Sequence, residues 1–257
     1  MPEVDPRAVV HESARLGDGV AVEPFAIVGP GVTIGRGTRV RSMSLVDRDT
    51  EIGEDCLVGH GAVVGADPQD LKYRGERTFL RIGNRTTIRE FASVHRAAGA
   101  GEATIIGDDV LIMAYAHVAH NCLIGNSVVI VNAVSLAGHV LVEDYGFIGG
   151  MTPVHQFVRI GTHSFIGGGS RITQDVPPYF KVAGIPTRPI EVNTVGLVRR
   201  GFPEVTLNEL RQCYRLLYLS DLNTTQALDR IREELPVTAE IRHLIEFIEG
   251  SSRGIIK

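Results

Sequence analysis

The sequence predicts an all-β solenoid, a parallel β-helix of hexapeptide repeats, followed by a small C-terminal helical domain. An aliphatic residue returns at every sixth position from Val10 to Ile172, with only two interruptions. A period of six fits neither the turn of a helix nor one long alternating strand, and it is typical of β-helices. Because the period stops after Ile172, we expect the solenoid over residues 1–178 and a linker with a helical domain over residues 179–257.

Two positions of each hexad are predicted to face the interior of the solenoid. The first carries a bulky aliphatic residue, and the residue four places on is small or β-branched, as in Ile34 and Thr38 or in Val118 and Cys122. Both positions have the same strand parity, so both side chains can point inward, where space near a corner is limited. Three hexads then make a triangular coil of about 18 residues, with neighbouring coils about 4.8 Å apart.

The two interruptions are predicted to be loops that leave the solenoid wall. The first lies near residues 66–79 and contains the polar side chains of Gln69, Asp70 and Lys72. The second lies near residues 96–103 and is rich in glycine and alanine. Loops on a rigid scaffold often carry binding groups, although a tolerated insertion would give the same pattern.

The C-terminal segment has the sequence features of three helices. Thr206 and Glu209 form a capping-box pattern that predicts the start of the first helix. Thr224 or Thr225 is expected to cap the second helix, and Gly250 to end the third. We therefore expect a small helical domain that packs against the last coils.

Composition excludes several classes of protein. The net charge of −4 argues against a nucleic-acid partner. No apolar run reaches the ~18 residues expected of a membrane-spanning helix. The N-terminus lacks the basic and apolar regions of a signal peptide, and three cysteines make no disulfide framework, so a reduced, cytoplasmic protein is expected. Apolar residues on a flat outer wall would favour packing against copies of the same chain, and a trimer is expected.

Four of the nine histidines fall close together in the repeat. His117 and His120 share one corner, and with a coil of about 18 residues His139 should stack beside His120. His155 should lie on the following coil, somewhat displaced. Converging imidazoles suit either a metal site or general-base catalysis, and their spacing leaves both open. We expect structural or surface roles for the remaining five, His11, His60, His95, His163 and His243.

Several local motifs are more specific than the repeat itself. They are Pro68–Tyr73, Ile88–Glu90 with Val94–Arg96, His117–Cys122, Leu136–Val140, Ile148–Phe157, Gln174–Tyr179 and Arg199–Phe202. Through these motifs nearly the whole chain resembles the UDP-N-acetylglucosamine acyltransferases of lipid A biosynthesis, within the hexapeptide acyltransferase superfamily. The resemblance implies a left-handed parallel β-helix, a homotrimer, and an active site between neighbouring subunits.

The resemblance also implies the reaction and its catalytic residue. An (R)-3-hydroxyacyl chain would pass from acyl carrier protein to the 3-hydroxyl of UDP-N-acetylglucosamine. The donor is carried on phosphopantetheine, and no metal or other cofactor is implied. By its motif His120 is the general base, and the amide oxygen of Asn121 can accept the other N–H of its imidazole.

The same resemblance assigns residues to the substrates. Gly150 would offer a backbone N–H to the thioester oxyanion, and Gly168 would limit the length of the acyl chain. Asn193, Arg199 and Arg200 would hold the uridine diphosphate, since an arginine can bind phosphate through two N–H groups. The other residues expected to line the cleft are Gln69, Asp70, Lys72, His117, Asn121, His139, His155 and Gln156.

Four alternatives remain at this point. A 3-amino sugar could be the acceptor, which would give an amide product. Another hexapeptide acyltransferase, using coenzyme A for instance, would have the same repeat. A γ-type carbonic anhydrase would need three imidazoles on one zinc ion, and a non-catalytic scaffold would need no histidine cluster.

Overall fold

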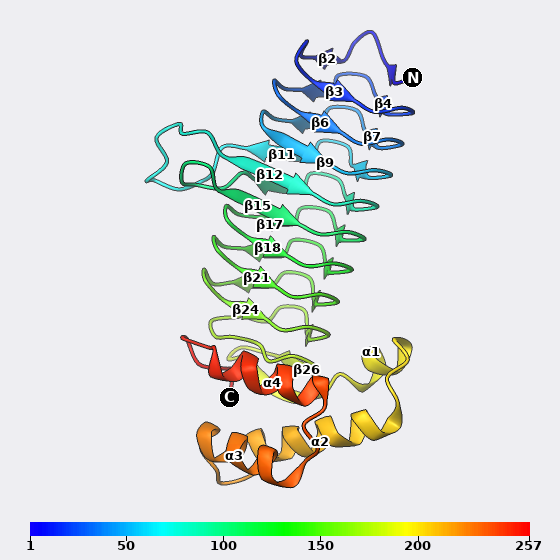
Figure 1. Ribbon diagram of the computed structural model, residues 1–257. Coiled ribbons are helices and arrows are strands. Elements are labelled where there is room, and N and C mark those ends of the chain that lie inside the picture. Colours follow the sequence, from blue (N-terminus) through cyan, green and yellow to red (C-terminus); the bar gives the residue numbers. More distant parts are fainter.

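The first two thirds of the chain wind into a stack of triangular coils, and helices cover one end of the stack (Figure 1). The computed structural model describes all residues, 1–257. Along the solenoid, each strand pairs with the strands three places before and three places after it in the chain. The coils are therefore built from three parallel sheets, which we call A, B and C. The winding is left-handed, opposite to the crossover that strand twist usually favours.

The strands of the three sheets are short, mostly two residues each. Sheet A consists of β1 (Glu3–Val4), β4 (Ala21–Val22), β7 (Arg39–Val40), β10 (Leu57–Val58), β13 (Thr87–Ile88), β16 (Leu111–Ile112), β19 (Val129–Ile130), β22 (Phe147–Ile148), β25 (Phe165–Ile166), β26 (Phe180–Ala183) and β27 (Arg188–Val192). Sheet B consists of β2 (Val9–Val10), β5 (Ile27–Val28), β8 (Leu45–Val46), β11 (Val63–Ala66), β14 (Ser93–His95), β17 (His117–Val118), β20 (Ser135–Leu136) and β23 (Pro153–Val154). Sheet C consists of β3 (Arg15–Leu16), β6 (Thr33–Ile34), β9 (Thr50–Ile52), β12 (Phe79–Ile82), β15 (Ala103–Ile106), β18 (Leu123–Ile124), β21 (Leu141–Val142) and β24 (Arg159–Ile160).

Both predicted interior positions of the hexad are buried. Ile34 and Thr38 are 1% and 0% exposed, and Val118 and Cys122 are both 0% exposed. Only the first coil is partly open, where Val10 and Leu16 are half-buried. The aliphatic side chains form one continuous core along the stack, so the prediction of a hexapeptide β-helix is confirmed.

Strand register gives the size of the two insertions. Val40 pairs with Val58, 18 positions on, which is one regular coil. Val58 pairs with Ile88, 30 positions on, and Ile88 pairs with Ile112, 24 positions on. The two irregular coils thus contain 12 and 6 extra residues, in loops that connect β11 to β12 and β14 to β15. Both loops leave the wall where sheet B turns into sheet C, which we call the B/C corner.

The C-terminal segment continues the solenoid before it becomes helical. Strand β26 adds to sheet A in parallel, and β27 folds back against β26 in antiparallel pairing. Four helices follow, α1 (Thr194–Arg199), α2 (Glu204–Tyr218), α3 (Thr224–Glu234) and α4 (Ala239–Glu249). A second apolar cluster joins these helices to Phe180 and Val192, so the helical domain is packed directly onto the last strands.

The start of α2 differs from the prediction. The helix begins at Glu204 after Pro203, and no side chain caps it. Thr206 is buried within the first turn, so the predicted capping box of Thr206 and Glu209 is wrong. Proline suits the beginning of a helix because its fixed φ and missing N–H cost nothing there.

The caps of α3 and α4 were predicted with mixed success. Asn223, and not Thr224 or Thr225, caps α3, and Gln226 completes a reciprocal capping box with it. Asparagine is a stronger N-cap residue than threonine, which explains the choice. Gly250 ends α4 as predicted.

Candidate active site

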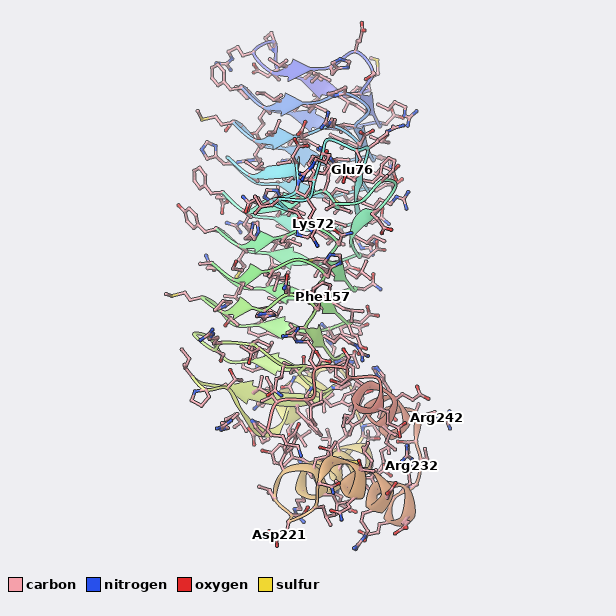
Figure 2. All side chains as sticks on the ribbon, turned by 90° about the vertical axis from the view of Figure 1, so that its left-hand side faces the viewer. Lys72, Glu76, Phe157, Asp221, Arg232 and Arg242 are labelled. Carbon is pink, nitrogen blue, oxygen red and sulfur yellow. The ribbon has the colours of Figure 1, made fainter.

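The B/C corner brings together most of the residues that were predicted to bind substrates. His120, Gly138 and Gln156 occupy the same turn position in three successive coils. The two loops leave the same corner in the two preceding coils. Lys72 and Glu76 of the first loop accordingly lie on the same side of the solenoid as Phe157 (Figure 2).

An aromatic stack runs along this corner. His139 lies beside His120, as predicted from the coil length: the ring centroids are 5.3 Å apart, and the rings are nearly perpendicular. The next ring in the stack belongs to Phe157, whose centroid is 4.7 Å from that of His139. Phe157 lies one full coil after His139 and continues the stack, whereas His155 lies on the same following coil but is displaced from the stack, as expected. His155 is exposed, and its Nδ1 lies 3.2 Å from Nη2 of Arg253.

The amide of Asn121 fixes the tautomer of His120. Asn121 Nδ2 donates to the Ala98 carbonyl oxygen at 3.1 Å, and the Ala98 N–H donates to Asn121 Oδ1 at 2.9 Å. This pairing orients the amide, so Oδ1 can only accept. Oδ1 lies 2.9 Å from His120 Nδ1, which must therefore carry the proton. The other ring nitrogen, Nε2, is left with a free lone pair, as a general base requires.

His117 lies beside His120 but in a different environment. Its Nδ1 is 2.9 Å from the Ser93 hydroxyl oxygen, and its ring packs at 5.1 Å against that of His95. Burial, followed by the neighbouring His95 and His120, lowers the pKa of His117 to about 4. His117 is therefore neutral at physiological pH, and it can present Nε2 as a hydrogen-bonding group without adding charge to the site. His95, expected to be structural or surface, is buried in this cluster.

The first loop brings charged groups near His139. Asp70 and Lys72 lie close enough to influence the titration of His139, whose pKa is lowered mainly by burial and by His120. Asp70 Oδ1 accepts the Lys72 N–H at 2.9 Å, which holds this part of the loop in a turn. The Lys72 and Gln69 side chains are exposed and have no partner within the chain. They are available to a ligand at this corner.

Gly138 is a site residue that the sequence analysis missed. A Cβ atom at Gly138 would lie 2.6 Å from Cε1 and 2.7 Å from Nε2 of His120, so the imidazole occupies the space that a side chain would need. Gly138 does not have a positive φ, so its backbone would accept other residues. Its N–H has no acceptor within the chain. The only signal in the sequence was the motif Leu136–Val140, which was assigned to His139.

Gly150 and Gly168 lie at a different corner, the A/B corner, where sheet A turns into sheet B. Both follow strands of sheet A, so within one chain they face away from His120. A Cβ atom at Gly168 would lie 3.2 Å from the Gly150 carbonyl oxygen, so the two glycines stack as bare backbone. Within a single chain Gly150 and His120 therefore lie at different corners, whereas Gly138 lies beside His120.

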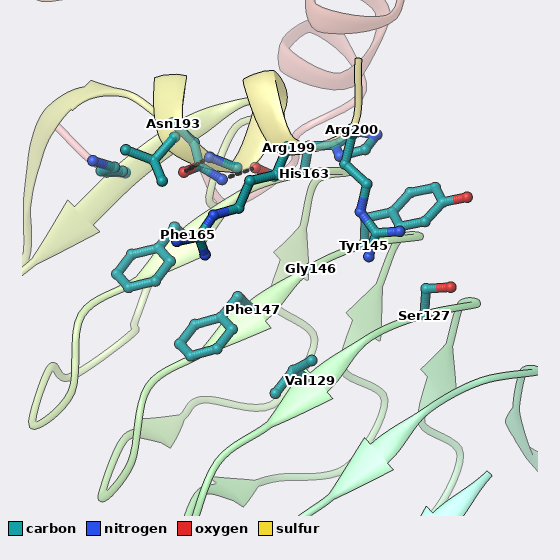
Figure 3. Close-up of a pocket in the computed structure, with 13 residues that line it drawn as sticks. Ser127, Val129, Tyr145, Gly146, Phe147, His163, Phe165, Asn193, Arg199 and Arg200 are labelled. Atoms are coloured by element: carbon teal, nitrogen blue, oxygen red, sulfur yellow. Dashed lines mark hydrogen bonds between the residues drawn. The ribbon is translucent and has the colours of Figure 1, made fainter. Parts of the chain in front are cut away.

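The residues expected to hold the nucleotide line a separate cavity of about 420 Å³ (Figure 3). Its floor is the outer face of sheet A, with Phe147 and Phe165 stacked at 4.7 Å. Its roof is α1, which carries Arg199 and is followed by Arg200. Neither arginine forms a salt bridge, and the Arg200 guanidinium lies 4.4 Å from the ring centroid of Tyr145.

Asn193 lines this cavity but has a structural task as well. Its Oδ1 accepts the Gly196 N–H at 3.3 Å as the N-cap of α1, and its Nδ2 donates to the His163 carbonyl oxygen at 2.9 Å. Both polar atoms of the side chain are therefore used to seat α1 on the solenoid. Asn193 shapes the cavity, and the unpaired arginines are the groups that remain for an anion.

The histidines do not converge in the way that a metal site requires. No group of three histidine, cysteine, aspartate or glutamate side chains in the chain has the arrangement to hold a metal ion. The imidazoles instead form separate pairs, His95 with His117 and His120 with His139. Within one chain, the carbonic anhydrase alternative, which needs three imidazoles on one ion, has no matching site.

Comparison with known proteins identifies the family. The model for UDP N-acetylglucosamine O-acyltransferase, domain 2, matches residues 175–256, and the bacterial transferase hexapeptide model matches 13–48 and 103–138. The acyl-[acyl-carrier-protein]–UDP-N-acetylglucosamine O-acyltransferase of Myxococcus xanthus is 49% identical over 258 residues, which covers 100% of both chains. The chain belongs to the UDP-N-acetylglucosamine O-acyltransferases.

Solved structures of UDP-N-acetylglucosamine acyltransferases have the same fold. The enzyme from Bacteroides fragilis superposes with a TM-score of 0.96 at 35% identity, covering 98% of this chain and 99% of that one. The enzyme from Arabidopsis gives a TM-score of 0.89 at 38% identity, covering 99% and 100%. The chain is therefore an acyltransferase, and both its solenoid and its helical domain superpose on these structures. None of the helices of this acyltransferase has the length and apolar character needed to cross a membrane.

Proposed function

We propose that this acyltransferase moves an (R)-3-hydroxyacyl group from acyl carrier protein to the 3-hydroxyl of UDP-N-acetylglucosamine, the first step of lipid A biosynthesis. The names of its relatives contain both substrates. The observation that carries the proposal is the His120–Asn121 pair, which leaves an unprotonated Nε2 at a corner lined by polar loops. This arrangement suits removal of a proton from a hydroxyl group.

In the proposed reaction His120 acts as general base. Nε2 takes the proton of the 3-hydroxyl while that oxygen attacks the thioester carbonyl carbon. The tetrahedral oxyanion then collapses, the carbon–sulfur bond breaks, and the imidazolium returns its proton to the phosphopantetheine sulfur. Positioned proton transfer of this kind typically contributes about 10²–10⁴-fold in rate. Asn121 orients the ring without adding a negative charge.

Gly138 is proposed as the donor to the oxyanion. Its N–H is free, and its Cα lies next to the imidazole that activates the attacking oxygen. A backbone donor aimed at a developing oxyanion is worth roughly 3 kcal/mol in comparable sites. This role was expected for Gly150, which lies at the A/B corner of the same chain.

The proposed site requires neighbouring subunits, and we propose a homotrimer. The nucleotide cavity lies on sheet A and Gly168 lies at the A/B corner, whereas His120 lies at the B/C corner. One sugar nucleotide can reach both the cavity and the base only if they come from different copies. Apolar residues with 49–74% exposure line the A/B corner and are available for this contact, namely Phe25, Met43, Phe91, Tyr115 and Met151.

We propose that the reaction needs no metal or other cofactor and takes place in the cytoplasm. The thioester already supplies an activated acyl group, and the base supplies the proton transfer. The three cysteines are free and buried, which suits a reducing compartment. Lys72, Asp70 and Gln69 are proposed to contact the sugar or the acyl chain, together with His117, His139, His155 and Gln156.

The experiment that tests the proposed function is a product assay with matched substrates. Donors would be acyl carrier protein loaded with 3-hydroxyacyl chains of graded length and the same chains on coenzyme A. Acceptors would be UDP-N-acetylglucosamine and its 3-amino analogue. We expect an alkali-labile ester from the carrier-protein donor, detected by mass spectrometry. Formation of amide only, or transfer only from coenzyme A, would favour the alternative acyltransferases instead.

A further inference from the structure

The two loops at the B/C corner are tied together by a guanidinium that is almost completely inaccessible to solvent. Arg96 begins the second loop and is 1% exposed. Its Nη1 donates to the Gly65 carbonyl oxygen and lies 3.4 Å from Asp47 Oδ2. Its Nη2 donates to Asp67 Oδ1, at the start of the first loop. A buried charge is costly unless it is paired and hydrogen-bonded, and here the two Nη atoms make these contacts while Nε has no partner.

Asp67 also closes the first loop on itself. Its Oδ1 accepts hydrogen bonds from Arg48 Nη2 at 3.1 Å and from the Tyr73 hydroxyl at 3.4 Å. The single hydroxyl hydrogen of Tyr73 is shared between Asp67 and the Glu76 carbonyl oxygen, which lies 3.1 Å from the hydroxyl oxygen. Residues 68–72, which carry the proposed substrate-binding side chains, are therefore bracketed by Asp67 and Tyr73.

The backbone around Arg96 is tied to the same loop and to the base. The Arg96 N–H donates to the Ala66 carbonyl oxygen at 3.0 Å, and His95 Nδ1 lies 2.7 Å from the Asp67 carbonyl oxygen. Two residues after Arg96, Ala98 holds the amide of Asn121 that orients His120. One buried side chain thus lies between the substrate loop and the support of the general base.

We propose that Arg96, Asp67 and Tyr73 form a clasp that positions the substrate loop relative to His120. The inference rests on the proposed function and deepens it, because it names positioning residues that do not contact the reacting atoms. Lysine carries the charge of arginine but has no planar fork, so it cannot serve Gly65 and Asp67 together. Tyr73 offers the mildest disruption, since phenylalanine removes only the hydroxyl that lies between Asp67 and the Glu76 carbonyl oxygen.

Four variants separate positioning from general stability. Arg96→Lys, Arg96→Met and Tyr73→Phe weaken the clasp, and Arg159→Met is the matched control. Arg159 is also partly buried, packs on the Phe247 ring at 4.3 Å and lies at the junction with the helical domain, away from the loops. The readouts are Tm, the KM of each substrate and kcat, all measured well below the lowest Tm.

We expect Arg96→Met to raise the KM of at least one substrate about tenfold, with a smaller increase for Tyr73→Phe and partial retention of function in Arg96→Lys. Tyr73→Phe should keep the wild-type Tm, and Arg159→Met should lower Tm without changing either KM. Unchanged KM values in both Arg96→Met and Tyr73→Phe would overturn the clasp and leave Arg96 a structural residue only.

A measurement without substrate keeps the two proposals distinguishable. Amide hydrogen exchange of residues 68–76 should be faster in Arg96→Met and Tyr73→Phe than in wild type, and unchanged in Arg159→Met. Equal exchange in the wild type and in Arg96→Met, Tyr73→Phe and Arg159→Met would overturn the clasp even if acyl transfer is confirmed. If the two variants exchange faster but the wild-type protein transfers no acyl group, the clasp is supported and the proposed function is contradicted.

Discussion

His120 Nδ1 lies 2.9 Å from the amide oxygen of Asn121, and that amide is held in one orientation by both main-chain polar groups of Ala98. A neutral amide can fix the tautomer of an imidazole as well as a carboxylate can. It differs from a carboxylate in that it does not stabilise the protonated ring. Asn121 therefore contributes to catalysis by orienting the His120 ring. Substitutions of Asn121 can separate this effect from that of a negative charge.

Two substitutions of Asn121 should have different effects. Asn121→Ala removes the acceptor for Nδ1–H, so kcat should fall by about 10–100-fold with little change in KM. Asn121→Asp restores an acceptor and adds a charge that favours the imidazolium, so the acid limb of the kcat/KM profile should move to higher pH. Profiles from about pH 5.5 to about pH 9 would measure both, and identical profiles for Asn121→Asp and wild type would contradict this account.

Gly138 is predicted to be essential because of the space that His120 occupies. Gly138→Ala would place a methyl group 2.6 Å from Cε1 of His120, so the ring must move and kcat should fall by about 10²-fold. Unfolding in urea supplies the control. Gly138→Ala should destabilise the wild-type chain but not the His120→Ala chain, where the clash is absent. Equal destabilisation in both backgrounds would show that the ring is not the obstacle.

Gly168 is predicted to limit the length of the acyl chain. Its position over the Gly150 backbone leaves a bare strip at the A/B corner, and Gly168→Met would fill it. The preferred donor should become shorter by several carbons, with kcat on short chains retained. Competition between donors of graded length measures the preference, and an unchanged optimum would place the end of the acyl chain elsewhere.

The junction between solenoid and helical domain should respond to pH through His243. Its Nε2 lies 3.0 Å from Glu143 Oε2, and this hydrogen bond raises the pKa of His243. A raised folded-state pKa stabilises the protein below the unfolded value near 6.5 and loses that effect as pH rises through the folded value. His243→Gln should therefore lower the free energy of unfolding more at about pH 6 than at about pH 9, by less than about 1 kcal/mol because the pair is partly exposed. The opposite order would refute the assignment.

Much of the fold was readable from the sequence because the period of six reports directly which side chains face inward. Ile34 and Thr38 could be assigned to the core from their spacing alone, and the two breaks marked the loops. The sequence did not show which of several nearby residues begins a helix. Helix α2 begins directly after Pro203 and not at Thr206. Both residues suit a helix N-terminus, and only packing decides between them.

The site was predicted in its parts rather than in its arrangement. The contact of His120 with His139 followed from the coil length. Phe157 packs on His139 because it occupies the same turn position one coil later, whereas His155 lies two residues before that position. Glycine has no functional side chain, so nothing in the sequence indicated that Gly138 belongs to the site. The position of Gly150 at another corner depends on which sheet precedes its turn, and that required the full topology.

The central claim is that His120 is the general base, and its replacement by alanine tests this most directly. His120→Ala should keep the wild-type Tm and assembly state, since the ring is only half-buried at the corner. Transfer of the 3-hydroxyacyl group to UDP-N-acetylglucosamine should fall by about 10²–10⁴-fold in kcat. A variant that folds normally and turns over within a few-fold of wild type would contradict the account.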